Sequence, residues 1–502
     1  MLKVSPLFSD GAVLCRKKEI RLFGEAEEGA RIRAELLDAK GELLSWGTGR
    51  AVDGRFLILL PPQEAQVGCT LLFTDGKETF RAKDILIGEV FLAGGQSNME
   101  WELQNADEGP ELIASHENAQ VRYFNVPKFA RFCSERDRAW EAAAWRAIAP
   151  GTGRDMSAVA YFFAMQLQRK LQVPVGIIDS YWGGTSITCW MEEAWLSRTG
   201  EGIRYLEEYA RKAEGVTMEA FLERDKAFHE EMQNWNGAVA VYKQAHPGCA
   251  WPEVEEAVGP SPWHPPVGPG DPFRPAGLYA TMIAPLAPLS LTGALFYQGE
   301  TDATRVEDCR YDTLMMSLID RWRDAFQEKE LPFLFVQLPM WIESGKQDSK
   351  TWPALRLAQS RVRDRMRNVA MACLLDQGEF GNLHPTRKRV VGERLYELAL
   401  QLIYGEAGKA SPRVIGKRVE DQRLLLLTDQ RLEVRDGKEP ALLEVAGADR
   451  KYVPASASLA GGGLAVSAPG VAYPLYARYA WTDYAVVNLF GTNGLPLEPF
   501  EI

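Results

Sequence analysis

Between about residue 86 and about residue 407, short apolar segments alternate with longer segments of helical periodicity, and this alternation restricts the fold more than any other feature. The apolar segments lie at 89–93, 174–179, 293–297, 332–337 and 369–376. The helical patterns lie at 157–171, 309–328, 354–365 and 386–403. Strands that alternate with helices predict an open parallel sheet with helices on both faces, so we expect an α/β fold here.

The two ends of the chain have a different pattern. Residues 1–85 and residues 408–502 contain short alternating segments separated by Gly, Asp and Pro turns, which is typical of small β-rich domains. A chain of 502 residues is also too long for one hydrophobic core. We therefore predict a β-sandwich-like domain over 1–85, a central α/β domain over 86–407 and a β-rich domain over 408–502.

Residues 200–275 interrupt the alternation within the central domain. Residues 200–235 have a charged helical pattern, whereas residues 250–275 are so rich in Pro and Gly that we expect no regular structure there. Two interpretations of this insertion stay open. It is either a lid or wall over a functional site, or a surface loop without a role.

Charge and composition exclude several classes of partner. The net charge of −11 argues against nucleic acid and anionic membranes, because both require a basic surface. The N-terminus has no signal-peptide pattern, and no stretch of 18 apolar residues predicts a membrane span. The seven cysteines form no C-x-x-C pair, and their odd number fits reduced thiols better than disulfides or a zinc site. We therefore expect a cytoplasmic protein.

Four of the predicted strands are each followed by a polar loop that contains glycine. These loops read GGQSN at 94–98, WGGT at 182–185, QGETD at 298–302 and GNLHP at 381–385. In an open α/β sheet, ligands bind at the carboxyl ends of the strands. The sequence therefore predicts that all four loops meet at one edge of the sheet and form a functional site there.

The residue types in these loops fit acyl transfer, which requires a nucleophile, a base and donors for an oxyanion. Ser97 is the candidate nucleophile, although a serine after Gly-Gly is also an ordinary turn residue. Position 99 is Met, so the G-x-S-x-G signature is absent. His384 is the candidate base, because it alone among five histidines follows a core strand. The others lie in segments typical of the surface: His116, His229, His246 and His264.

Donors for the oxyanion are available in three of the loops. The backbone amides of Ser97 and Gly184 are candidates, and the side-chain amide of Gln298 could add a third donor. For the Gly183-Gly184 pair the alternative is a plain tight turn. For Gln298 and Glu300 the alternative is a buried polar pair that satisfies loop backbone.

Five motifs in this order resemble the sialate O-acetylesterase family of SGNH-type carbohydrate esterases. They are GGQSNMEW, SYWGGTSITCWM, FYQGETDA, LHPTRKRVVGERL and ARYAWTDYAVVNLFGTNGLPLEPF, and the resemblance spans roughly residues 85–500. It implies a flavodoxin-like, three-layer α/β/α SGNH hydrolase domain that removes O-acetyl groups from sugars without a metal or other cofactor. It also implies Ser97 as nucleophile, His384 as base, and oxyanion donors near Gly184 and Gln298.

The chain departs from the family pattern at the orienting acid. Related enzymes usually carry Asp two or three residues before the histidine, where this chain has Gly381 and Asn382. Asn382 could hold the imidazole through a neutral hydrogen bond. Glu300 could supply a charge from the neighbouring loop, and Asp376 is the third candidate. We favour Glu300. A Ser-His pair without an acid could still be active, because removing the third member of a triad reduces the catalytic rate less than removing the nucleophile or the base does.

We therefore predict an O-acetylesterase that acts on sialic acid or a related acetylated sugar. An acetylxylan or other glycan esterase of the same fold is one alternative, and a catalytically inactive carbohydrate-binding protein is an alternative of another class. The expected partner is a small acetylated sugar or oligosaccharide, and the oligomeric state stays open, a homo-oligomer included. Three tryptophans near the predicted edge could stack on a sugar ring, although most of the 14 are expected in the core: Trp101, Trp182 and Trp190.

Overall fold

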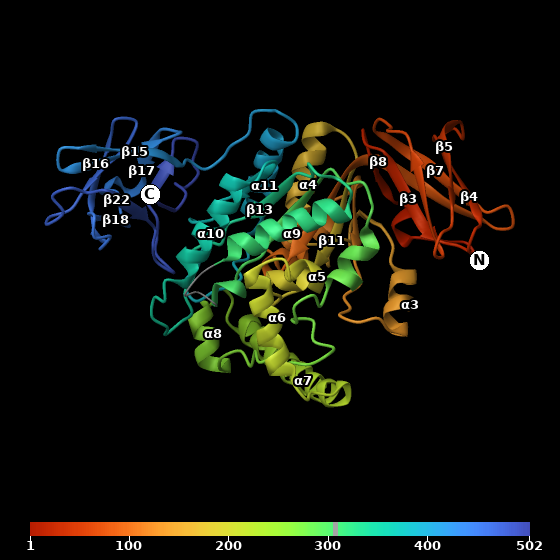
Figure 1. The fold of residues 1–502 in the computed structure, drawn as a ribbon, viewed down its shortest axis with the longest axis horizontal. Helices are drawn as coiled ribbons and strands as arrows, with labels where there is room; N and C mark the ends of the chain where they lie inside the picture. The colour runs from red at the N-terminus through yellow and green to blue at the C-terminus, as the bar shows by residue number, and fades with distance from the viewer. Residues whose placement is uncertain (305–309) are drawn as a thin grey trace.

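The computed structural model describes residues 1–304 and 310–502, and its centre is a largely parallel sheet (Figure 1). The strand order is β10-β9-β11-β8-β12-β13-β14; β10 pairs antiparallel with β9, and the other pairs are parallel. The strands are β8 (Thr79–Gly95), β9 (Asn118–Asn125), β10 (Arg146–Ile148), β11 (Val175–Tyr181), β12 (Gly293–Tyr297), β13 (Phe333–Val336) and β14 (Val369–Ala372). The predicted parallel sheet is present, and β9 and β10 extend it by two strands that the sequence pattern did not predict.

The order of the five strands β11-β8-β12-β13-β14 places a topological switch point at the middle of the sheet. In chain order they are second, first, third, fourth and fifth, so β8 and β12 flank the point at which the direction of strand addition reverses. Gly95 at the end of β8 pairs with Tyr181 on one side and with Tyr297 on the other. Ligands bind at such a point in open α/β sheets. The loops after β8, β11 and β12 therefore meet where a ligand site is expected.

Helices cover both faces of this sheet. Phe91 in β8 packs edge to face against Phe163 of α4 (Ala158–Leu171), with ring centroids 4.8 Å apart. Gly94 in the same strand leaves room for Trp322 of α9 (Tyr311–Ala325), whose ring would lie 2.6 Å from a Cβ at that position. Residues 91 and 94 point to opposite faces of a strand. Because α11 (Lys388–Leu402) packs on α4 and α10 (Thr351–Arg365) on α9, two helices cover each face.

The main helices of the sheet follow the predicted ranges closely. The helices predicted at 157–171, 354–365 and 386–403 correspond to α4, α10 and α11. The helix predicted at 309–328 corresponds to α9, and its first residue, Cys309, lies outside the described residues. Shorter helices lie in the connections: α1 (Ser97–Glu100), α2 (Gly109–Ser115), α3 (Ser134–Ala142) and α5 (Glu193–Leu196).

The N-terminal β region is joined to the central sheet by a shared strand. One small sheet has the order β1-β3-β6, and β5, β4 and β7 form an antiparallel ladder that ends on β8. Because β8 runs without a break from 79 to 95, the predicted boundary at 85/86 falls inside one strand. One hydrophobic core also runs from this region into the central sheet. The strands are β1 (Lys3–Val4), β2 (Val13–Cys15), β3 (Ile20–Glu25), β4 (Arg31–Leu37), β5 (Leu43–Arg50), β6 (Arg55–Leu60) and β7 (Gln66–Thr74).

The C-terminal β region has a core of its own. Its sheets have the orders β15-β16-β21-β20, β17-β23 and β19-β18-β22-β24. This second core includes only a few residues of the central region: Met340, Cys373 and Leu375. The strands are β15 (Val414–Glu420), β16 (Arg423–Thr428), β17 (Leu432–Val434), β18 (Leu443–Ala446), β19 (Val453–Pro454), β20 (Ser456–Ala460), β21 (Gly463–Ser467), β22 (Tyr476–Tyr479), β23 (Leu489–Gly491) and β24 (Phe500–Glu501).

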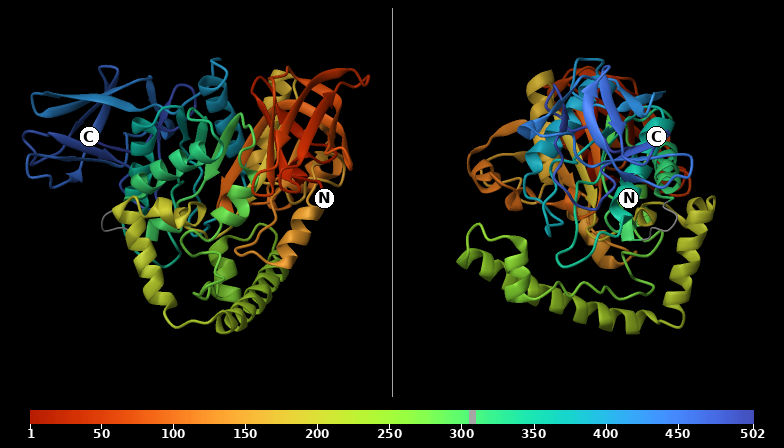
Figure 2. Two further views of the ribbon diagram at one scale, coloured as in Figure 1. Left: turned by 45° about the vertical axis from the view of Figure 1, so that its right-hand side comes forward. Right: turned by 90° about the vertical axis from the view of Figure 1, so that its left-hand side faces the viewer.

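The insertion at 200–275 extends from the body of the molecule and carries a long helix across its lower side (Figure 2). It contains α6 (Gly200–Ala213), α7 (Met218–Ala245) and α8 (Trp251–Val258), followed by an irregular segment. The expectation that 250–275 would have no regular structure is wrong for α8. Its proline, Pro252, lies in the first turn, where the missing N–H is not required and the fixed φ favours a helix.

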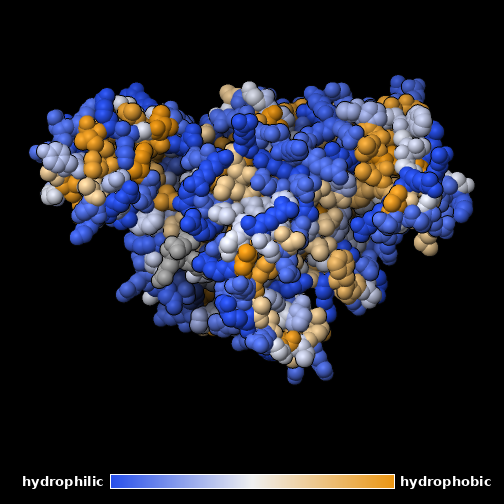
Figure 3. All heavy atoms as spheres, viewed as in Figure 1, coloured by the Kyte–Doolittle hydropathy of each residue, from blue (hydrophilic) through white to orange (hydrophobic). Residues whose placement is uncertain are grey.

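The surface is largely hydrophilic on the face shown in Figure 3, with apolar residues gathered over the two terminal β regions. Exposed examples include Val52 and Leu59 in the N-terminal region and Ile415 and Val486 in the C-terminal region. Among the described residues, no helix has the length and apolar character that a membrane crossing requires.

Candidate active site

The loop after β8 leaves the sheet through a very close contact with β12. Gly95 has φ +137°, and a Cβ on it would lie 2.1 Å from the carbonyl oxygen of Tyr297. The next residue, Gln96, donates its backbone N–H to the same carbonyl at 3.0 Å. Only glycine fits such a backbone conformation and such a contact. Ser97 then opens the short helix α1, so its position is set directly by two paired strands.

The hydroxyl of Ser97 lies within hydrogen-bond distance of the imidazole of His384. The Oγ–Nε2 distance is 2.8 Å, although 287 residues separate the two positions. The His384 ring stacks on Trp101, with centroids 5.5 Å apart and planes 21° apart. Loss of hydration lowers the pKa of His384 to about 3, and the charges of Lys388 and Lys243 act in the same direction. A neutral imidazole at this distance can accept the serine proton.

Two backbone N–H groups at the nucleophile, that of Ser97 itself and that of Gly184, are candidates to bind an oxyanion. The Gly183-Gly184 turn follows β11, and a Cβ on Gly183 would lie 3.2 Å from the Cβ of Ser97. Gly184 has φ +77°. Within the described ranges, neither Ser97 nor Gly184 donates its N–H to a backbone or side-chain acceptor. The structure therefore brings together both predicted backbone donors and the predicted nucleophile.

Gln298 is engaged elsewhere, and the structure does not support its prediction as a third oxyanion donor. Its Nε2 donates to Asp302 Oδ2 at 2.5 Å, to Gln96 Oε1 at 3.1 Å and to the carbonyl of Thr185 at 3.1 Å. Its Oε1 accepts from the hydroxyl of Tyr311 at 2.7 Å. An amide has two N–H donors, and here buried acceptors occupy them. The alternative prediction, a buried polar group that satisfies loop backbone, describes Gln298 better.

The residues proposed as orienting acid have other partners. Glu300 is buried, and its Oε1 accepts from Asn98 Nδ2 at 2.6 Å, while its Oε2 has no hydrogen-bond partner. Burial raises the pKa of Glu300. Asn382 accepts the backbone N–H of His384 at 3.0 Å and donates to Glu379 at 2.8 Å. No hydrogen bond joins the imidazole of His384 to Glu300 or Asn382 in the part of the chain that the structure describes.

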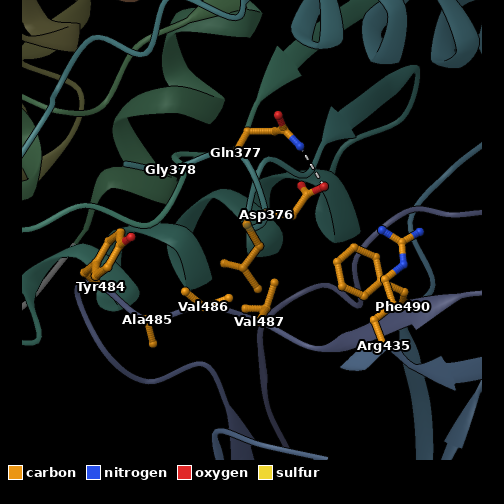
Figure 4. Close-up of a pocket in the computed structure, with 10 residues that line it drawn as sticks. Asp376, Gln377, Gly378, Arg435, Tyr484, Ala485, Val486, Val487 and Phe490 are labelled. Carbon is orange, nitrogen blue, oxygen red and sulfur yellow. Dashed lines mark hydrogen bonds between the residues drawn. The ribbon is translucent and has the colours of Figure 1, made fainter. Parts of the chain in front are cut away.

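Asp376 is committed to a salt bridge. Both of its carboxylate oxygens bind Arg394, each at 2.7 Å, and Gln377 donates to it at 2.8 Å. It lines a cavity of about 260 Å³ against the C-terminal strands, together with Tyr484 and Phe490 (Figure 4). The structure therefore gives Asp376 a structural role at this interface and does not place it on His384.

Two buried side chains of the candidate site were missed by the sequence reasoning, Asn98 and Lys388. Asn98 donates to Glu300 and, at 3.1 Å, to the carbonyl of Leu383, and its Oδ1 accepts from Lys388 Nζ at 2.5 Å. It thus joins the serine loop to the residue before His384. Lys388 is 2% exposed, and burial lowers its pKa to about 7, although Glu300 acts in the opposite direction. The available signal was spacing, since Asn98 follows Ser97 directly and Lys388 lies four residues after His384, at the start of α11.

The insertion contacts both sides of this site. A Cβ on Gly184 would lie 2.3 Å from the indole ring of Trp263. A Cβ on Gly381, in the histidine loop, would lie 3.5 Å from Pro252 at the start of α8. The structure therefore favours the interpretation of the insertion as a wall beside the site over that of a loop without a role.

The tryptophans and histidines singled out from the sequence separate into different environments. Trp190 is fully buried and packs in the core, whereas Trp101 stacks on His384 and Trp182 is half-buried. Three of the other histidines bind local partners: His116 with Tyr161, His229 with Asp225 and His246 with Tyr242. In the described ranges, no group of three or more histidine, cysteine or acidic side chains is placed to hold a metal ion.

Comparisons with known proteins agree with the resemblance predicted from the sequence. A family model described as "Carbohydrate esterase, sialic acid-specific acetylesterase" matches residues 261–401. Curated relatives include the sialate O-acetylesterases of Rattus norvegicus, 29% identical over 84% of this chain and 78% of the relative, and of Homo sapiens, 27% identical over 84% and 76%. A carbohydrate acetylesterase from Xanthomonas citri has a similar structure, with a TM-score of 0.78, 28% identity, and coverage of 100% of this chain and 99% of that one.

Proposed function

We propose that this chain, a carboxylic ester hydrolase related to the sialate O-acetylesterases, removes O-acetyl groups from sugars through a Ser97–His384 pair. The observation that carries this proposal is the 2.8 Å contact between Ser97 Oγ and His384 Nε2, beside two unengaged backbone N–H groups. The strand order and the helices on both faces support the finer assignment as a flavodoxin-like SGNH hydrolase. The cytoplasmic location stays a prediction.

The geometry supports a two-step acyl transfer. Ser97 Oγ attacks the acetyl carbonyl carbon while His384 Nε2 takes the serine proton. The N–H groups of Ser97 and Gly184 hold the oxyanion of the tetrahedral intermediate. The C–O bond to the sugar then breaks, and the imidazolium gives its proton to the departing sugar oxygen. A water molecule, deprotonated by His384, next attacks the acetyl-serine, and acetate leaves as the serine regains its proton.

We propose that the reaction uses this pair without a third side chain on the imidazole. The ring is held instead by stacking on Trp101 and by the bond from the His384 backbone to Asn382. On this account, Glu300→Gln and Asn382→Ala each reduce kcat much less than His384→Ala does. A loss in Glu300→Gln as deep as that in His384→Ala would make Glu300 the third member after all.

The proposed activity is tested by acetate release from O-acetylated sialic acid and from acetylated xylo-oligosaccharides, measured side by side. Release should vanish in Ser97→Ala and persist in Ser9→Ala, a control whose hydroxyl has no hydrogen-bond partner. The preferred sugar decides between the sialate and the glycan esterase alternatives. No release from either sugar, with wild type and Ser97→Ala binding them equally, would instead support a carbohydrate-binding protein.

A further inference from the structure

We propose that Trp263, in the insertion, is the platform on which the sugar ring of the substrate stacks while Ser97 attacks its acetyl group. This inference rests on the proposed function and deepens it, because it assigns substrate recognition to a segment outside the four loops of the sheet. It predicts that the insertion decides which esters are good substrates, while the loops of the sheet carry the chemistry.

The first support is the position of Trp263 relative to the nucleophile. A Cβ on Gly183 would lie 3.2 Å from the Cβ of Ser97, and a Cβ on Gly184 would meet Trp263, so the serine and the indole lie against neighbouring residues of one turn. A side chain on Gly184 would overlap the indole, with 2.3 Å to its nearest ring carbon. Gly184 also offers the free N–H proposed for the oxyanion. A substrate whose acetyl oxygen binds this N–H therefore has its sugar within reach of the indole.

The second support is that the indole is both exposed and held in place. Trp263 is 43% exposed, although it is a large hydrophobic side chain. Phe228 of α7 and Phe273 pack against it with ring centroids 5.6 Å and 5.5 Å away, at interplanar angles of 71° and 72°. Neither ring lies parallel to the indole. Such edge contacts hold the indole in place, whereas a parallel stack would cover one of its faces.

The segment around Trp263 is itself anchored to the rest of the molecule. The hydroxyl of Tyr209 in α6 donates to the carbonyl of Gly268, and the carboxylate of Asp271 accepts the N–H of Phe273 at 2.7 Å. Arg274 donates to the carbonyl of Ala130 at 3.1 Å. A ring presented by an anchored segment loses little conformational entropy on binding, which is the condition for a preformed binding site.

The chemistry of the platform points to a sugar ring as its occupant. Tryptophan offers a large, rigid apolar surface, and the ring carbons of a pyranose present C–H groups that can cover it. Two of the three tryptophans predicted from the sequence are poorer candidates for this contact: Trp190 is buried in the core, and Trp101 already stacks on His384. An acetyl ester without a ring cannot make this contact.

The test compares an ester that has a sugar ring with one that has none. Trp263→Ala and Trp263→Phe are assayed for kcat and KM on the acetylated sugar that wild type hydrolyses best, and on methyl acetate. Trp46→Ala is the matched control, since Trp46 is 52% exposed on β5 in the N-terminal region. Thermal unfolding of each variant establishes that it is folded.

We expect Trp263→Ala to lower kcat/KM for the acetylated sugar about tenfold or more, mainly through KM, and to leave methyl acetate almost unchanged. Trp263→Phe should restore part of the loss, and Trp46→Ala should change neither substrate. An equal loss on both esters would overturn the inference, because the ring would then only support the Gly184 turn. Wild type that releases acetate from no acetylated sugar would overturn the proposed function itself, and the inference with it.

Discussion

Ser97 lies directly beyond a strand that is paired on both sides, whereas His384 lies well beyond the end of β14, in a segment without helix or strand. The serine loop is positioned by backbone, since Gly95 contacts the Tyr297 carbonyl and Gln96 donates to it. The histidine loop depends more on side chains: apart from one backbone bond from Gly381 to Ile342, Asn382 binds the His384 N–H, and Asn98 binds the carbonyl just before it.

The serine loop (94–101) and the histidine loop (381–385) therefore owe their positions to two different kinds of contact within one site. A loop built on strand ends is as rigid as the sheet and tolerates almost no change in backbone shape. A loop held by side chains can be loosened one hydrogen bond at a time. The same kind of substitution should therefore reduce folding in the first loop and mainly activity in the second.

The largest expected effect is on folding, from Gly95→Ala compared with Gly381→Ala. In the serine loop the new Cβ meets the Tyr297 carbonyl at 2.1 Å, and we expect a loss of at least about 3 kcal/mol in the free energy of unfolding. In the histidine loop its nearest neighbour is the hydroxyl of Ser344, which has no hydrogen bond to lose, and Pro252 lies at an ordinary 3.5 Å, so the loss should be about 1–2 kcal/mol from φ +71°. Urea unfolding of both variants measures the difference; equal losses would remove the distinction between the loops.

The next effect concerns the side chain that ties the two loops together. Asn98→Ala leaves Glu300, Lys388 and a backbone carbonyl without a buried partner, which should lower the free energy of unfolding by about 1–3 kcal/mol. It should also reduce kcat about a hundredfold, because the serine and histidine are no longer fixed to each other. Asn382→Ala, assayed in parallel, should reduce kcat less. The opposite ranking would show that the histidine loop does not depend on the serine loop for its position.

A smaller effect is expected in the pH dependence of stability, through Lys388. Burial lowers the pKa of this residue to about 7, so above that pH the folded chain holds the neutral amine while the unfolded chain still binds the proton. The unfolded state then binds more protons, and the free energy of unfolding rises between about pH 7 and the ordinary lysine pKa. Lys388→Met should remove this contribution to the rise. The free energy of unfolding of wild type and of Lys388→Met is measured at pH 7 and at pH 9. An equal change between the two pH values in both proteins would contradict the prediction.

The smallest effect is a shift in the pH at which kcat/KM falls on the acid side of the pH profile, called the acid limb below. Because the pKa of His384 is lowered to about 3, the imidazole stays neutral, and kcat/KM should hold down to about pH 5, where an ordinary histidine would be protonated. Lys243→Met removes one of the charges that lower this pKa and should move the limb upward by less than about one pH unit. Lys226→Met, exposed on the same helix, should not move it. A wild-type limb near pH 6.5 would be inconsistent with the environment of the histidine loop.

The sequence predicted the helices and strands of the central sheet well, because hydrophobic periodicity and the Gly and Pro residues between segments depend on local structure. The alternation of strands and helices gave the parallel sheet, and the four polar loops gave its functional edge. Ser97 and His384 came from residue type and placement alone. The domain boundary predicted at 85/86 is not a break in the structure, because β8 is continuous through it and belongs to both sheets.

The roles of the supporting residues depend largely on partners that are distant in the sequence. Gln298 has the right side chain for an oxyanion donor, but whether its N–H groups are free is decided by Asp302, Thr185 and Gln96. Glu300 likewise has the charge expected of an orienting acid, but its hydrogen bond in the structure is with Asn98. Trp263 lies in a Pro-rich segment whose position over Gly184 has no local signal. Sequence pattern therefore predicted the pairing of Ser97 with His384 better than the groups that hold the two residues in place.

The most direct test of the account is a double-mutant cycle on Ser97 and His384. The kcat/KM for the acetylated sugar is measured for wild type, Ser97→Ala, His384→Ala and the double variant, with folding checked by thermal unfolding. If the two residues act as one unit, each single variant loses about 10⁴-fold or more, and the double variant is no slower than the singles. Losses that multiply, or a His384→Ala variant that keeps most of its activity, would show that the serine finds its base elsewhere.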